Sequence, residues 1–333
     1  MDYRSLPDIL RGSRVFIQTH NFPDPDAIGS AYGLREFLLH YGIPSTLCYI
    51  GSIERASVGH IIREYGISIQ EYGQIEDMTA QDSIVLVDGQ KHNANMTDLP
   101  GTEVACIYHH PTFVACEYRY RDIRQVGACS SIIAEYFLKG GVPLTKETAT
   151  MLLYGLQVDT ENMTRGVADL DLDVFPALYR AADHGMLDKL AGKSLEFADL
   201  RAFGAAIETI RIFGRAGFAN IPFPCPDPLI AEIADFILSL AEVDVAVVYA
   251  VRDGGLKFSA RSLLPEVHSG NMLHEVLSGH GGRGGGHAYM AGGFVPSDGL
   301  RAISSDPTLR GDRLRELFLD YIRRQPPHGG RTA

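Results

Sequence analysis

An apolar run that ends in a histidine and two aspartates constrains the fold of this chain more than any other stretch. Residues 15–19 read Val-Phe-Ile-Gln-Thr, the apolar and β-branched pattern of a buried strand, and His20 follows directly. Asp24 and Asp26 come next, separated by a proline, before a helical pattern over 27–39. Ligands bind at the carboxyl ends of strands in open α/β sheets. The stretch therefore predicts a strand, a tight turn and a helix, with three potential metal ligands in the turn.

The two aspartates also have a purely structural interpretation. Asp often caps the helix that follows it, because its side chain accepts a hydrogen bond from a backbone N–H of the first turn. Capping would account for Asp24 or Asp26 taken alone. A histidine and both aspartates directly after a buried-strand pattern favour metal binding.

Two later strand patterns end in the same kinds of side chain. The apolar run at 83–87 is followed by Asp88, and the run at 103–108 by His109 and His110. Continuous apolar runs are typical of strands buried in parallel sheets. One Asp or His at a strand end is usually a turn or surface residue, but three successive strands with such ends predict that the side chains meet at one sheet edge.

Asp159 is a further carboxylate suited to this edge, although a helix cap or a turn would also explain it. It follows an amphipathic pattern over 146–156 and precedes Thr160. The potential ligands are then His20, Asp24, Asp26, Asp88, His109 and Asp159. This set is large enough for two divalent metals that share one carboxylate, the arrangement used by phosphatases and nucleases. Mixed imidazole and carboxylate ligands suit Mn²⁺, Fe²⁺ or Zn²⁺ better than Mg²⁺.

The second half of the chain has a different pattern. A chain of 333 residues is long for a single core, which predicts two domains. Residues 195–213 indicate one long helix between them, and a proline cluster at 221–228 interrupts regular structure. An Asp-Gly turn at 253–254 predicts a hairpin whose second strand ends at Arg261 and Ser262.

A glycine-rich run at 278–287 contains basic side chains. Its last five residues are Arg283, Gly284, Gly285, Gly286 and His287. Successive backbone N–H groups without side chains can wrap a phosphate. A flexible surface loop is the alternative, but the basic residues within the run favour anion binding.

Charge and cysteine content exclude several classes of function. The net charge of −11 argues against a long nucleic-acid duplex or an anionic membrane as partner, since both need a basic face. The five cysteines are odd in number and lack paired spacing, which predicts a reducing compartment without structural disulfides. No apolar stretch is long and uncharged enough to span a membrane, and no secretory signal pattern is present. We expect a cytoplasmic protein.

Taken in order, these motifs resemble those of the DHH–DHHA1 phosphoesterases. The resemblance covers nearly the whole chain. The matching features are the stretch His20 to Ser30, Asp88, His109-His110, Asp159-Thr160, Arg261-Ser262 and Gly284 to His287. Length and layout are most similar to the branch of short-oligonucleotide ribonucleases that also dephosphorylate adenosine 3′,5′-bisphosphate.

The resemblance implies an α/β fold with two domains across a cleft. A parallel-sheet DHH domain with helices on both faces would cover 1–190, and a smaller α/β DHHA1 domain would cover 213–325. A helical linker at 191–212 and a disordered tail at 326–333 complete the expected layout.

The resemblance also implies roles for single residues. His20, Asp24 and Asp88 would hold one metal. Asp26, Asp88, His109 and Asp159 would hold the other, with Asp88 bridging. His110 would contact the scissile phosphate. Arg261, Ser262, Arg283 and the segment Gly284, Gly285, Gly286 and His287 would bind the rest of the substrate.

The sequence departs from the family at one named position. The first residue of the Asp-His-His triplet is Tyr108 here. A phenol hydrogen-bonds but carries no charge at neutral pH, and loss of a carboxylate beside metal ligands typically costs about 10–100-fold in affinity or activity. We expect weakened or redirected catalysis.

The expected function is hydrolysis of short oligonucleotides, linear dinucleotides or nucleoside 3′,5′-bisphosphates by metal-activated water. The alternative is a nucleotide-binding or regulatory protein on the same scaffold, which Tyr108 alone favours. A third reading, a pyrophosphatase or polyphosphatase, needs a very basic substrate pocket, and few Lys and Arg residues lie near the motifs. The choice between RNA and DNA, the cleavage direction and a homodimer stay open.

Overall fold

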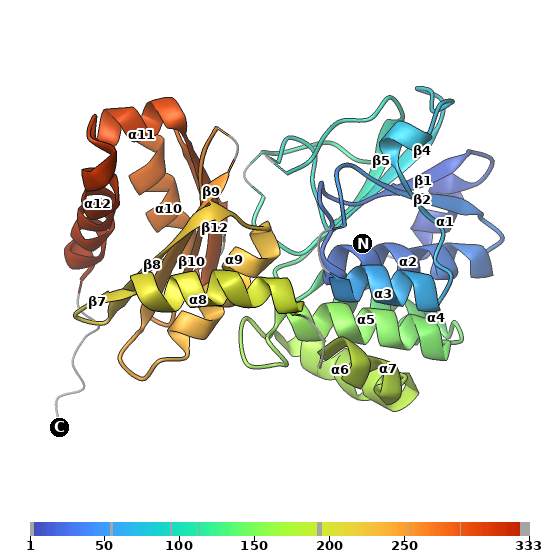
Figure 1. The fold of residues 1–333 in the computed structure, drawn as a ribbon. Coiled ribbons are helices and arrows are strands. Elements are labelled where there is room, and N and C mark those ends of the chain that lie inside the picture. The colour runs from blue at the N-terminus through green and yellow to red at the C-terminus, as the bar shows by residue number, and fades with distance from the viewer. Residues whose placement is uncertain are drawn as a thin grey trace. The chain divides into compact units, whose positions relative to one another are not determined.

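Two units, residues 1–194 and 195–333, make up the chain, and each is built on a six-stranded sheet (Figure 1). The computed structural model describes residues 3–53, 56–93, 95–112, 114–191, 195–252, 254–286 and 288–326. Within these ranges, no helix has both the length and the apolar character needed to cross a membrane.

All strands of the first sheet are parallel. They are β1 (Val15–Gln18), β2 (Ser45–Tyr49), β3 (Ile69–Glu71), β4 (Ser83–Val87), β5 (Thr102–Tyr108) and β6 (Tyr120–Ile123). Their spatial order is β3-β2-β1-β4-β5-β6. The chain winds outward from β1 to β3 and then continues on the other side of β1 from β4. The carboxyl ends of β1 and β4 therefore flank the point where the winding reverses, which is where such sheets bind ligands.

The sequence patterns predicted the central strands but not the two edge strands. β3 and β6 are short and carry charged residues such as Glu71 and Asp122. Edge strands bury less of their surface than central ones, so the continuous apolar run that marks β1, β4 and β5 is missing from them.

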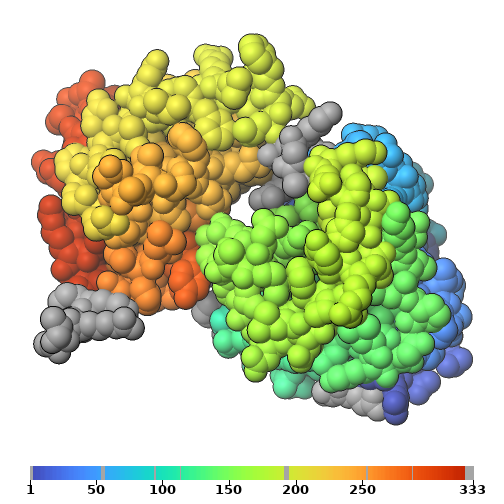
Figure 2. Space-filling view, turned by 90° about the horizontal axis from the view of Figure 1, so that it is seen from below, coloured from blue at the N-terminus to red at the C-terminus, as the bar shows by residue number. Residues whose placement is uncertain are grey.

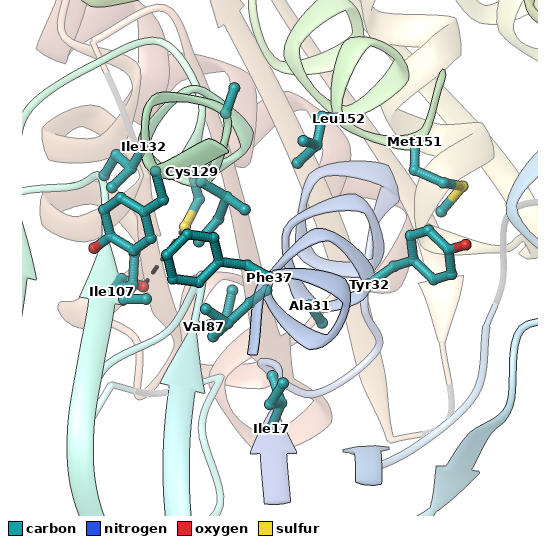
Figure 3. Packing of buried hydrophobic residues seen from close by; sticks show 14 of the residues in the cluster. Ile17, Ala31, Tyr32, Phe37, Val87, Ile107, Cys129, Ile132, Met151 and Leu152 are labelled. Carbon is teal, nitrogen blue, oxygen red and sulfur yellow. Dashed lines mark hydrogen bonds between the residues drawn. The ribbon is translucent and has the colours of Figure 1, made fainter. Parts of the chain in front are cut away.

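Helices cover one face of the first sheet. They are α1 (Ser5–Leu10), α2 (Pro25–His40), α3 (Ala56–Glu64), α4 (Cys129–Gly140), α5 (Lys146–Asp159), α6 (Asp169–Ala181) and α7 (His184–Ala191). Ile17, Val87 and Ile107 point from the strands toward α2 and α4 (Figure 3). The atoms of α6 and α7 form the outer surface on this side, yellow-green in Figure 2.

We expected helices on both faces, but every described α-helix that joins a core cluster of the first unit joins the one on this face. The opposite face buries Phe16 and Leu86 against Met78 and Met96, which lie in connecting segments. The connections that follow β3 and β4 lack a helical apolar pattern and form loops, with one 3₁₀ turn at Tyr72–Gln74.

The second unit has a mixed sheet between two helical layers. Its strands are β7 (Arg211–Phe213), β8 (Ala216–Pro224), β9 (Val245–Arg252), β10 (Gly255–Ser262), β11 (Arg283–Gly286) and β12 (Met290–Pro296), in the order β11-β12-β10-β9-β8-β7. Only β8 and β9 pair in parallel. Its helices are α8 (Leu200–Thr209), α9 (Asp227–Leu238), α10 (Ser269–Ser278), α11 (Ser297–Ile303) and α12 (Arg310–Arg324). One layer contains α8 and α9, the other α10, α11 and α12.

Two segments of this half differ from expectation. The long helix over 195–213 is instead a 3₁₀ turn, α8 and β7, and α8 buries Ala202 and Ala206 in the second unit's core rather than forming a linker. Part of the proline cluster continues β8, because β7 pairs only with Ala216 to Phe218 and leaves the later prolines on an open edge. Most of the expected tail, 327–333, lies outside the described residues.

Candidate metal centre

Seven predicted site residues of the first unit meet at the carboxyl edge of its sheet. They come from the turn between β1 and α2, from the first turn of α2, from the residues after β4 and β5, and from the end of α5. They form three groups: His20, Asp24 and Asp88; Asp26, His109 and Asp159; and Asp88, His109 and His110. In each group the potential ligand atoms lie within 4.8 Å of one another.

A backbone carbonyl orients the ring of His20. Its Nδ1 lies 2.9 Å from the oxygen of Asn21. Because a carbonyl only accepts, Nδ1 carries the hydrogen, and Nε2 points at the acids, 3.8 Å from Asp24 Oδ2 and 3.6 Å from Asp88 Oδ2. Metal-binding histidines are typically held this way, with one nitrogen on a carbonyl and the other on the metal.

His109 is oriented by the same device. Its Nδ1 donates to the Val126 oxygen at 3.0 Å. Its Nε2 lies 3.2 Å from Asp88 Oδ1, 3.5 Å from Asp159 Oδ2 and 3.8 Å from Asp26 Oδ2. One imidazole nitrogen thus faces three carboxylates.

Asp88 stands between the two histidines, with Oδ2 toward His20 and Oδ1 toward His109. The residue is buried and has a φ of 55°, in the left-handed region that Asp tolerates better than most residues. Among the residues that the structure describes, no donor reaches Oδ1 in good hydrogen-bond geometry. A buried carboxylate oxygen without a well-aligned donor fits a ligand of a cation.

Asp26 is in the first turn of α2, and its carboxylate contacts the first turn of α4. Its Oδ2 accepts from the Cys129 N–H at 2.6 Å and its Oδ1 from the Ser130 N–H at 2.9 Å. The positive end of the helix dipole stabilises a carboxylate placed there. Asp24 caps α2 by accepting from the Ala27 N–H at 3.0 Å. The capping interpretation of Asp24 therefore holds, and it leaves Oδ2 facing His20.

The four carboxylates of the cluster favour the binding of a proton or a cation among them. Burial and the neighbouring carboxylates raise the pKa of both Asp26 and Asp159. Burial opposes protonation of His20 and His109, but the surrounding carboxylates outweigh it and raise each imidazole pKa to about 10. Four carboxylates that draw protons onto two histidines make a donor set suited to divalent cations.

Tyr108 points away from this cluster into the apolar layer on the opposite face. Its hydroxyl accepts from Asn93 Nδ2 at 2.9 Å, and burial raises the pKa of the phenol to about 12. Its ring packs edge-on against His110, with centroids 5.1 Å apart. His110 in turn lies against His109, at 3.6 Å between centroids.

Arg261 and Ser262, expected to bind substrate, have contacts within the second unit. Arg261 is buried and its guanidinium donates to both carboxylate oxygens of Asp235, at 2.6 and 3.2 Å. Ser262 is also buried, and its hydroxyl donates to the Leu264 oxygen while accepting from the Leu264 N–H. Substrate binding by either residue stays a prediction.

Residues 283–286 of the glycine-rich run form a strand rather than a wrapping loop. β11 pairs with β12 at the edge of the second sheet. A Cβ at Gly284 would lie 2.7 Å from the backbone carbonyl of Leu273, so glycine allows α10 to approach the strand. Arg283 is exposed, and His287 lies outside the described residues. Anion binding by this segment stays a prediction.

Sequence reasoning missed the backbone groups that hold the centre. The Val126 carbonyl and the N–H groups of Cys129 and Ser130 orient His109 and Asp26. Every residue has such groups, so no sequence signal distinguishes these.

Family models match both units. The model of the DHH family, N-terminal domain, matches residues 14–156, and that of the DHHA1 domain matches 225–306.

Individual relatives are more distant. An uncharacterized protein of Methanocaldococcus jannaschii is 25% identical over 313 residues, 92% of this chain and 64% of that protein. A probable manganese-dependent inorganic pyrophosphatase of Streptococcus thermophilus is 24% identical over 151 residues, 44% of this chain and 48% of that protein. The chain spans less than two thirds of either relative. An exopolyphosphatase-related protein from Bacteroides fragilis shares the fold, with a TM-score of 0.76 and 16% identity over 96% of this chain and 95% of that one.

Proposed function

The chain belongs to the DHH family and carries a DHHA1 domain, and on that premise we propose that it is a metal-dependent phosphoesterase. The proposed substrates are short oligonucleotides, linear dinucleotides or nucleoside 3′,5′-bisphosphates. The proposed cofactors are two divalent cations, with Mn²⁺ first among them.

One observation carries this proposal: Asp88 presents one oxygen to each of two histidines, and each histidine also faces further carboxylates. One cation would be held by His20, Asp24 and Asp88. The other would be held by Asp26, Asp88, His109 and Asp159. Divalent cations in such a pair activate water and neutralise charge on a phosphoryl group.

The chain's own groups position this chemistry. The Asn21 and Val126 carbonyls keep Nε2 of each histidine directed inward. The first turn of α4 holds the Asp26 carboxylate in place. His110 packs against His109 and is less buried than it, and its imidazole is the group we assign to the scissile phosphate.

Manganese is supported by the relative from Streptococcus thermophilus, whose name states that dependence and whose match falls on 44% of this chain. Mixed imidazole and carboxylate ligands agree with that metal. The same relative makes inorganic pyrophosphate a second candidate substrate. Pyrophosphate carries more charge than a phosphodiester and needs more basic side chains to bind it. Lys91, three residues after Asp88, pairs with Glu103, and Arg165, six residues after Asp159, pairs with Glu161. This pairing favours a phosphodiester, as in short oligonucleotides and linear dinucleotides, over pyrophosphate.

A nucleotide-binding protein with little catalysis is the other candidate, because Tyr108 replaces the family aspartate. The Tyr108 hydroxyl bonds Asn93 and not one of the six proposed ligands, which nevertheless stay grouped. Replacing Tyr108 with Asp separates the two functions. A strong rise in hydrolysis from a negligible baseline would make the natural protein a binder.

The direct test is Mn²⁺-dependent hydrolysis of a 5-mer RNA, linear pGpG and pApA, adenosine 3′,5′-bisphosphate and pyrophosphate. Asp88→Asn is the control, since it keeps the shape of the side chain and removes its charge. We expect hydrolysis of nucleotides that falls in the control by more than the roughly 10–100-fold lost with an outer-shell partner. Nucleotide binding without hydrolysis under any divalent metal would reject the enzyme.

A further inference from the structure

Phe22 is an exposed aromatic residue in the turn that carries the metal ligands. It lies two residues after His20 and two before Asp24, and its side chain is among the exposed large hydrophobics at 56%. Its φ is 55°, in the left-handed region where a bulky residue is an outlier. Strain of this kind concentrates at ligand clamps and active sites.

The surrounding backbone holds Phe22 in this conformation. Its N–H donates to the Ile50 oxygen at 2.8 Å, just after β2. The neighbouring Asn21 N–H donates to the Asn95 oxygen at 2.7 Å. Two successive N–H groups of the turn are therefore bonded to segments that follow β2 and β4, and these bonds stabilise the strained conformation.

Glycine at position 51 makes room for the ring. Gly51 has a φ of +95°, and a Cβ there would lie 2.6 Å from Cε1, 2.7 Å from Cδ1 and 2.9 Å from Cζ of Phe22. One side of the ring is thus supported by backbone, while more than half of the residue stays open to solvent. This is a rigid, half-open aromatic surface, not a core residue.

The position of the Phe22 ring limits which ligands can contact it. Two residues of chain span at most about 7 Å, so the Phe22 backbone lies within that distance of those of His20 and Asp24. A ligand with a phosphate at the metal centre would bring the adjoining part of the molecule to the ring. Nucleobases stack on such rings whatever their sequence, and each stack is worth about 1–3 kcal/mol.

We propose that Phe22 is the stacking platform for a nucleobase of the substrate held at the metal centre. This inference rests on the proposed function and narrows it, because it makes the substrate a base-bearing phosphoester rather than a base-free phosphate.

Equilibrium binding tests the platform without relying on catalysis. The probe is a linear dinucleotide carrying 2-aminopurine, with methylene in place of the bridging ester oxygen, titrated into full-length protein with Mn²⁺. Stacking quenches its fluorescence. Phe22→Leu keeps an apolar side chain and removes the ring, while Phe22→Tyr keeps the ring; a matched analogue lacking the base is the second ligand.

We expect Phe22→Leu to lose the quenching and to raise Kd for the base-bearing probe by about 5- to 100-fold. Phe22→Tyr and the binding of the abasic analogue should stay near wild type. Equal weakening of both ligands by Phe22→Leu would show that the ring only shapes the metal turn, and would overturn the proposal. Wild-type protein that binds both ligands equally would overturn it as well.

A separate assay measures Mn²⁺-dependent hydrolysis of the natural dinucleotide. Base-dependent binding without Mn²⁺-dependent hydrolysis would reject the phosphoesterase and leave the platform standing. Equal hydrolysis of substrates with and without a nucleobase would reject the stacking role of Phe22, and the proposed phosphoesterase activity would stand.

Discussion

At the scale of single residues, backbone carbonyls orient the two imidazole rings of the metal centre. Carbonyls of Asn21 and Val126 take the Nδ1 hydrogens, so each Nε2 lone pair faces carboxylates. The two lone-pair donors and the four acids, one of which is the shared Asp88, repel one another unless a proton or a cation lies between them. The same geometry thus explains both the raised imidazole pKa values and the suitability for metal.

This competition predicts a pH dependence of metal binding. Without metal, the carboxylates raise the pKa of His20 and His109 to about 10, so both rings are protonated at neutral pH. A cation must displace these protons, and raising the pH toward that value removes its competitor. Mn²⁺ affinity should therefore rise between about pH 6 and pH 9, with proton release.

Calorimetric titration of Mn²⁺ in two buffers of different ionisation enthalpy measures the protons released. In Asp88→Asn, which removes one of the charges raising both pKa values, fewer protons should be released. Affinity that is flat across this pH range would contradict the assignment of the two histidines as ligands.

At the scale of elements, the segment leading into α4 ties α6 to the centre. Asp171 of α6 is fully buried, and its Oδ2 accepts from the N–H groups of Gly127 and Ala168, each at 2.7 Å. The next residues along the chain supply the groups that hold Asp26. Asp171 is thus a positioning residue that acts on the centre through a loop.

Replacing Asp171 with Ala should lower Mn²⁺ affinity by about 10–100-fold, as loss of an outer-shell partner does. Two partly buried N–H groups lose their acceptor, and the start of α4 then shifts. Asp171→Asn, which keeps one oxygen, should recover part of the affinity. Isothermal titration measures both.

Asp82→Ala is the matched control. Asp82 is also buried and accepts from the Thr79 N–H at 2.7 Å, but it precedes β4 and so lies at the opposite edge of the sheet. It should cost stability without changing Mn²⁺ affinity. Equal losses of affinity in the two variants would show that Asp171 contributes only to folding.

The contact between β11 and α10 gives a second prediction at this scale. Gly284→Ala would place a Cβ 2.7 Å from the Leu273 backbone, and overpacking of this kind costs about 1–3 kcal/mol of unfolding free energy. Gly285→Ala meets nothing within 4 Å and should change stability little. Urea denaturation measures the pair, and equal effects would contradict the packing explanation for the glycines.

At the scale of the whole molecule, each unit has its own sheet and its own core clusters. All proposed ligands lie in the first unit. We therefore expect two thermal transitions, of which Mn²⁺ raises only one. At a concentration of about 100 times Kd, binding adds about 2.7 kcal/mol, or roughly 5–10 °C for a domain of this size.

Scanning calorimetry with and without a chelator measures the shift. Asp88→Asn should keep both transitions and lose the response to Mn²⁺. A single transition that moves as a whole would show that the two units unfold together.

Local patterns in the sequence determined much of this protein. The apolar runs of β1, β4 and β5 predicted a parallel sheet, and the polar residues after them predicted a shared edge, because parallel strands end on the same side. Edge strands such as β3 and β11 escaped prediction, since an edge strand does not need a continuous apolar run.

Tertiary structure alone decided how the centre is supported. The Val126 carbonyl, the first turn of α4 and Asp171 act on residues far away in the chain. The conformation of Phe22 likewise depends on Gly51 and Ile50. A sequence pattern records which side chains are present and how they repeat, whereas these contacts join backbone groups that every residue carries, and only the folded chain selects which of them meet.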